Sequence, residues 1–200
     1  MSPSADIGST SRFGLPAAPA GLCLVQDLLN TRALHVTSGH GFPDLLAETS
    51  TASAWLKSAL DTWSRQTGRP TPMISLTGKD LRDLRRYRDH LHAWVTDPAT
   101  EGPELPAQIL VRPVSGTVAY EARQDTAGGL LSLVCLELLL AGQTDRLARF
   151  RTCANTPCGA AFYDTSRNGR RVWHDPKTCG NVVNLRASRS RQKSGDATRS

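Results

Sequence analysis

The sequence predicts a mainly α-helical protein with a small β-hairpin, in which an N-terminal helical domain precedes a C-terminal treble-clef-like zinc finger. Three observations lead to this prediction. Leucine and tryptophan recur at helical spacing through much of the first 150 residues. Two apolar runs flank the turn-forming dipeptide Ser115-Gly116. Two pairs of metal-ligand residues with equal internal spacing lie in the last fifty positions.

Composition and charge set the broad class. The chain has 200 residues, of which 39% are hydrophobic and 21% charged, and this balance allows a packed core. Residues 1–150 carry 14 Lys and Arg against 15 Asp and Glu, whereas residues 151–200 carry 10 against 3. A basic segment attached to a neutral body favours a polyanionic partner, with nucleic acid first. The alternative is a solvated basic tail.

The cysteine count and the termini argue against export. Five cysteines, an odd number, do not suit a disulfide framework, and the first residues lack a basic and an apolar segment in succession. The longest apolar run, residues 130–142, contains Ser132 and Glu137 and is too short to cross a bilayer. We therefore expect a cytoplasmic protein with no membrane partner.

The first helices follow a leader. Residues 1–19 are rich in Ser, Pro, Gly and Ala, which predicts a flexible segment. Residues 21–36 predict a helix with leucines near one face. A second helix, over 51–67, has its apolar stripe at four-residue steps: Trp55, Ala59 and Trp63.

The remaining elements of the body have clear end signals. Thr77 can cap a helix whose first turn contains Asp80, and Asp97-Pro98 ends that helix. The runs QILVRPV and GTVAYEA predict a hairpin around Ser115-Gly116. A strongly apolar helix over about 127–141 closes the body.

The body shows no catalytic motif. Cys23 and Cys135 lie in apolar helical surroundings and are expected to be small buried hydrophobes. No phosphate-binding glycine loop, nucleophile elbow or His-Glu-x-x-His motif occurs, and the other histidines follow no metal spacing: His35, His40, His90 and His92. We therefore do not predict an enzyme.

The chemistry is concentrated at the C-terminus. Cys153 and Cys158 are separated by four residues, and so are His174 and Cys179. Such pairs, carried on two turns, predict a tetrahedral Cys₃His site for Zn²⁺. Four protein ligands leave no open position for water, so the expected site is structural and not catalytic. About 10–16 kcal/mol of zinc-binding free energy would compensate for the few apolar side chains of this segment.

Basic side chains surround the predicted site. Asn168-Gly169 favours a turn that would pair Phe162–Asp164 with Arg171–Trp173 as a short β-ribbon. A helix would follow Cys179. The ribbon and the helix together carry basic side chains that are candidates for binding phosphates: Arg167, Arg170, Arg171, Arg186, Arg189 and Lys193. The alternative is that these side chains merely keep a small module soluble.

This segment resembles the CGNR zinc finger of bacterial proteins. The resemblance rests on the Cys153/Cys158 pair, the FYDTSRN run, the Arg-Arg-x-Trp step that ends at Trp173, and Cys179-Gly180-Asn181. The body is similar to the ABATE helical domain that accompanies this finger, through LCLVQDLLNTRA. The resemblance implies an ABATE-like domain over 20–148, a finger over 149–192 and a flexible tail over 193–200.

Two positions depart from the family pattern. His174 stands where the family has cysteine; because imidazole and thiolate both bind zinc, we expect His174 to be the fourth ligand. Val182 replaces the signature arginine, which removes either a nucleic-acid contact or a link between finger and body.

The resemblance implies a DNA-binding transcriptional regulator of the bacterial cytoplasm. The finger would contact phosphates, and the body would form a homodimer or sense a small-molecule effector. The alternatives are a zinc-stapled adaptor and a small-molecule-binding protein, neither of which would bind DNA.

Overall fold

The computed structural model describes residues 8–34 and 41–197, with side chains described as far as residue 192. Helices dominate, and two small antiparallel hairpins complete the structure, as the sequence predicts. No helix among the described residues is long and apolar enough to cross a membrane.

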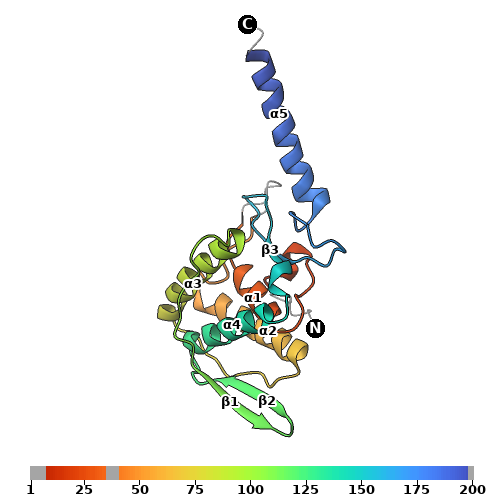
Figure 1. Cartoon of the computed structure of the whole chain (residues 1–200). Helices are drawn as coiled ribbons and strands as arrows, with labels where there is room; N and C mark the ends of the chain where they lie inside the picture. The colour runs from red at the N-terminus through yellow and green to blue at the C-terminus, as the bar shows by residue number, and fades with distance from the viewer. Residues whose placement is uncertain (1–7, 35–40, 198–200) are drawn as a thin grey trace, which may run out of the picture.

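Four helices form the body (Figure 1). They are α1 (Leu22–Leu29), α2 (Thr49–Thr67), α3 (Gly78–Thr96) and α4 (Ala127–Gly142). Every residue of α1 is buried, so this short helix forms the centre against which the others pack. The stripe predicted for α2 is confirmed, because Trp55, Ala59 and Trp63 all lie in the core.

The predicted ends of α3 are confirmed. Thr77 is its N-cap, and the Asp80 carboxylate accepts a hydrogen bond from the Thr77 backbone N–H at 2.7 Å, which completes a capping box. The helix ends at Thr96, immediately before Asp97-Pro98.

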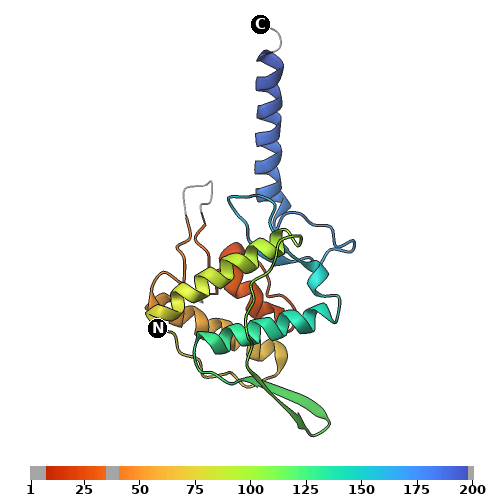
Figure 2. The same ribbon diagram turned by 60° about the vertical axis from the view of Figure 1, so that its left-hand side comes forward.

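The hairpin is also confirmed. Strand β1 (Ile109–Val114) pairs with β2 (Thr117–Ala122), and Val114 faces Thr117 across the turn. Ser115 and Gly116 both have positive φ, at 47° and 78°, as a two-residue type I′ turn requires. The hairpin lies at the end of the molecule opposite the C-terminal helix (Figures 1 and 2).

The N-terminal segment differs from the flexible leader expected for residues 1–19, whose first seven positions lie outside the described residues. Residues 8–19 pack on the body, and Ser9, Thr10 and Ala18 are buried. The Ser9 hydroxyl donates to the Asp27 carboxylate at 2.8 Å, and the Thr10 N–H donates to the same oxygen at 3.1 Å. Side-chain hydrogen bonds to α1 therefore order a segment whose composition suggested flexibility.

Helix α1 is shorter than the helix expected over 21–36. The Arg12 guanidinium donates to the carbonyls of Asn30 and Arg32, and the Thr31 hydroxyl donates to the Leu28 carbonyl at 2.7 Å. These bonds satisfy backbone carbonyl groups at the C-terminal end of α1, where the chain leaves the helical path. Positions 35 and 36 lie outside the described residues.

The ribbon of the finger uses different strands from those predicted. Strand β3 (Phe150–Thr152) pairs with β4 (Ala161–Tyr163), so the hairpin encloses the first cysteine pair. Residues 171–173 do not pair with β4, because the Asp164 carboxylate accepts from the N–H groups of Ser166 and Arg171, both at 2.8 Å. The Asn168-Gly169 step thus belongs to a loop closed by one aspartate.

The chain ends in α5 (Asn181–Ala197), which follows one π-helical turn, Pro176–Gly180. The helix predicted after Cys179 is confirmed, and its backbone continues through residues 193–197, where a flexible tail was expected. Both views show α5 leaving the finger and projecting away from the body (Figures 1 and 2).

Candidate metal centre

The four predicted metal ligands come together. The Sγ atoms of Cys153, Cys158 and Cys179 and a ring nitrogen of His174 all lie within 4.8 Å of one another. His174 Nδ1 is 3.3 Å from Cys158 Sγ and 3.7 Å from Cys179 Sγ. Zn–S bonds of about 2.3 Å in a tetrahedron place two sulfurs about 3.8 Å apart. The donor types and their spacing therefore fit zinc with only small adjustments.

A tight turn presents the first pair. Cys153 follows β3, and Cys158 precedes β4. The Asn155 carbonyl accepts from the N–H groups of Cys158 and Gly159, at 2.7 and 3.1 Å, and this folds the turn back on itself. Gly159 has a φ of 57°, a left-handed conformation that glycine adopts without strain.

The second pair lies at the π-helical turn: Cys179 is part of it, and His174 comes just before its N-cap, Asp175. The Asp175 carboxylate accepts from the Lys177 N–H at 2.8 Å and from the Thr178 hydroxyl at 2.9 Å, and these bonds lower the pKa of Asp175. A Cβ on Gly180 would lie 3.1 Å from the Trp173 ring. Glycine at this position therefore lets the tryptophan pack directly beside the ligand turn.

Hydrogen bonds between the cysteines shift their pKa values in opposite directions. The Cys158 thiol stabilises the thiolate of Cys153 and lowers the pKa of Cys153 to about 4, while the same contact raises the pKa of Cys158. Burial raises the pKa of Cys179, although Asn155 Nδ2 lies 3.3 Å from its sulfur as a donor. A divalent cation would stabilise all three thiolates at once, so binding is expected to release protons.

Residues of the body also contact the centre. His92 of α3 donates from Nε2 to the Gly159 carbonyl at 2.7 Å, and its burial lowers its pKa. The Phe13 ring meets His174 edge-on, with ring centroids 5.9 Å apart. Phe13 and Leu15 pack against the apolar side of the cysteine cluster. The N-terminal segment and α3 therefore hold and cover the metal site.

Helix α1 and its C-cap residue, Asn30, hold β4 through side-chain amides. Asn30 Oδ1 accepts from the Ala161 N–H at 2.8 Å, and Asn30 Nδ2 donates to the Ala161 carbonyl at 3.0 Å. Gln26 Nε2 adds a donor to that carbonyl at 3.3 Å. Asn30 therefore completes the hydrogen bonding of Ala161 much as a neighbouring strand would.

The predicted phosphate-binding residues divide into two groups. Arg171 donates to the His174 carbonyl at 2.6 Å, and Arg186 donates to Asn155 Oδ1 at 3.4 Å, so both support the metal centre. The other described members of the set are exposed: Arg167, Arg170 and Arg189. The side chain of Lys193 lies outside the described side chains.

Sequence reasoning missed the residues that surround the ligands. Asn155, Asn30 and His92 contact the ligand turns or β4, yet none stands at a spacing that marks a metal site. Asn155 alone gave a signal, since an asparagine between two cysteine ligands can hydrogen-bond a thiolate.

Comparison with known families agrees with this geometry. Residues 149–192 match the family model of the CGNR zinc finger, and all four clustered ligands lie within the match. The match does not extend to residues 20–148, so the likeness of the body to the ABATE domain stays a prediction. No curated protein matches the chain. The C-terminal segment is therefore similar to a CGNR zinc finger, and its three cysteines and one histidine support binding of a metal ion, with zinc the best fit.

Proposed function

We propose that the protein is a zinc-dependent, DNA-binding regulator of the bacterial cytoplasm, in which α5 and the finger loop contact phosphates. The observation that carries the proposal is the position of α5, which starts at the metal centre and projects from the body with Arg186, Arg189 and Arg191 exposed. Four protein ligands leave zinc no open position, so the proposal assigns the metal a structural role and no catalytic step.

The charge of α5 suits a polyanion. Its sequence from residue 181 to 195 contains no Asp or Glu and four basic residues: Arg186, Arg189, Arg191 and Lys193. At about 1.5 Å per residue, the 17 residues of α5 span roughly 25 Å. A helix of this length can lie in or across the major groove of DNA, which is about 12 Å wide.

The finger loop supplies the second group of contacts. Arg167 and Arg170 are exposed in the loop that Asp164 closes. Arg149 steadies this loop by donating to the carbonyls of Asp164 and Ser166, at 3.1 and 2.8 Å. Because Arg149 already orders this loop, Arg167 and Arg170 can contact phosphates with little further loss of conformational entropy.

DNA binding by the zinc-loaded protein tests the proposal, measured by fluorescence anisotropy on a labelled duplex over a salt series. We expect log K to fall linearly with log salt, and Arg189→Ala to reduce the slope by about 1. Arg82→Ala, an exposed change on α3, is the matched control and should leave the slope unchanged. Arg186 is unsuitable for this test, because its bond to Asn155 would disturb the metal centre.

One observation favours the second candidate, an adaptor that binds protein through the finger. Leu185 on α5 is 57% exposed and Val172 is 48% exposed, so apolar surface lies among the basic residues. Zinc-loaded protein without salt-dependent DNA affinity would overturn the first proposal and leave this one.

A further inference from the structure

A cavity of about 310 Å³ lies in the body, away from the metal centre. Its walls come from the start of α1, the end of α2, strand β2 and the last turns of α4. This volume is at the lower end of the range for small-molecule sites. The lining residues include Gly21, Arg69, Tyr120, Glu137, Leu140 and Arg146.

Glu137 is the unusual group in this cavity. Its side chain is only 4% exposed, and Oε1 accepts from Trp63 Nε1 at 2.8 Å and from the Tyr120 hydroxyl at 2.7 Å. Within the described part of the chain, no side chain or backbone group donates to Oε2, and no Lys, Arg or His pairs with Glu137. Oε2 is therefore the oxygen of this largely buried carboxylate that remains open to the cavity, where a donor or cation could bind it.

The local backbone makes room for this carboxylate. A Cβ on Gly21 would lie 1.7 Å from Glu137 Oε2, so only glycine permits the carboxylate to lie there. The preceding Ala20 has a φ of 53°, a left-handed conformation that is uncommon for alanine. The turn that starts α1 therefore accommodates the glutamate at some cost in backbone strain.

The other walls carry the opposite charge. The Arg69 guanidinium lies over the Tyr120 ring, 3.6 Å from its centroid, and Arg146 is exposed near the end of α4. Glu137 is the only acidic residue among the described residues that line the cavity. The cavity thus has an anionic floor and two cationic side chains on its walls.

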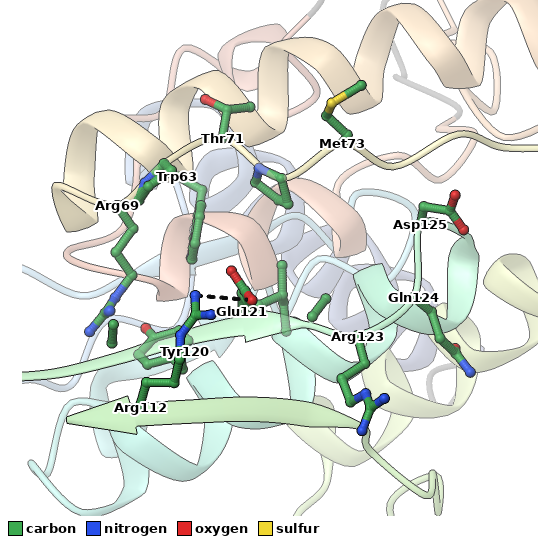
Figure 3. A pocket seen from close by; sticks show the side chains of 15 residues that line it. Trp63, Arg69, Thr71, Met73, Arg112, Tyr120, Glu121, Arg123, Gln124 and Asp125 are labelled. Atoms are coloured by element: carbon green, nitrogen blue, oxygen red, sulfur yellow. Dashed lines mark ion pairs between the residues drawn. The ribbon is translucent and has the colours of Figure 1, made fainter. Parts of the chain in front are cut away.

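A neighbouring cavity of about 400 Å³ shares Arg69 and Tyr120 with the smaller one, and Figure 3 shows its lining residues. Its charged lining is already paired in part, since Arg112 and Glu121 form an ion pair at 3.1 Å. None of the charged residues that line it is buried. The chemistry therefore favours the smaller cavity.

We propose that the smaller cavity binds a small zwitterion of the amino-acid class. The ammonium group donates to Glu137 Oε2, and the carboxylate faces Arg69 and Arg146. The proposal concerns the body alone and does not depend on DNA binding.

Thermal unfolding of the full-length, zinc-loaded protein in the presence of each standard L-amino acid tests the proposal. We expect at least one to raise the midpoint and to bind in calorimetry. For that amino acid, the amine without the carboxylate and the acid without the amine should each bind at least about tenfold more weakly. Amine binding as tight as that of the amino acid would overturn the zwitterion assignment, and a panel without any stabilising member would overturn the site.

Variants locate the site. Glu137→Gln keeps an acceptor for Trp63 and Tyr120 but replaces the free oxygen with an NH₂ group, so we expect affinity to fall about 10- to 100-fold. Arg146→Ala should weaken binding, whereas Arg123→Ala, in the neighbouring cavity, should not. If Glu137→Gln fails to fold, Leu140→Trp at the partly exposed wall should block binding without touching the glutamate. Unchanged affinity in Leu140→Trp would place the ligand elsewhere.

Discussion

The helical body and the outer finger, by which we mean the two ligand turns and α5, differ in how much apolar surface they bury. In the body, all of α1 is buried and two fully buried tryptophans, Trp55 and Trp63, fill the space between helices. In the outer finger, the buried apolar cluster among the described residues consists of Cys153, Ala160 and Cys179, and two of these belong to the candidate metal centre. Apolar burial is therefore extensive in the body and small in the outer finger, where we expect a bound metal ion to supply the missing stability.

The boundary between these regions lies inside the segment matched by the finger family. Phe150 and Ala161, from β3 and β4, belong to the core of the body. The ligand turns and α5 lie beyond that core. The sequence predicted that zinc binding compensates for the few apolar side chains of this segment. The structure shows that its ribbon packs on the body, so we expect the need for metal to lie in the outer part.

Metal removal should have the largest effect and should be confined to the outer finger. A structural zinc ion contributes about 10 kcal/mol or more in isolated fingers, so chelation is expected to unfold the ligand turns and the start of α5. Hydrogen exchange should show fast amides there and continued protection in α1 to α4. His174→Cys, which keeps four donors, should retain about one zinc per chain. Loss of protection throughout the body would contradict the division.

A change in the body core should have a smaller but global effect. Leu24→Ala in α1 removes a fully buried side chain and is expected to cost about 3 kcal/mol of unfolding free energy. Denaturant unfolding would measure the loss, and competition with a chelating dye should give an unchanged zinc affinity. A fall in zinc affinity that matches the loss of stability would show that the two regions are coupled.

The contact between the regions gives the smallest of these effects. Asn30→Ala leaves the N–H and carbonyl of Ala161 without the amide that pairs with them, at a cost of about 2 kcal/mol. We expect both the unfolding free energy and the zinc affinity to fall slightly. Asn184→Ala, at an exposed position on α5, is the control and should change neither.

The sequence predicted the elements whose signals are local. Trp55 and Trp63 at helical spacing marked α2, Thr77 marked the start of α3, and Ser115-Gly116 marked the hairpin turn. The four ligands were found because zinc requires few residue types at short spacing. Each of these features depends on residues close together in the chain.

The sequence did not predict features that depend on distant residues. Gln26 and Asn30 are four residues apart, a spacing that would suit two polar side chains on an exposed helix face. Both side chains instead donate hydrogen bonds to the Ala161 carbonyl. Asp164 closes a loop where Asn168-Gly169 suggested a hairpin. Side-chain to backbone hydrogen bonds of this kind follow no periodicity, so a pattern search cannot find them.

Asn30 and Ala161 are separated by 131 positions, and this separation orders events during synthesis. The nascent chain presents α1 to α4 before β4 leaves the ribosome, so the surface that receives β4 can be complete when it emerges. His174 and Cys179 follow later still. We therefore expect ion capture to be the last step of maturation, after the body has brought the two halves of the donor set to a high effective concentration.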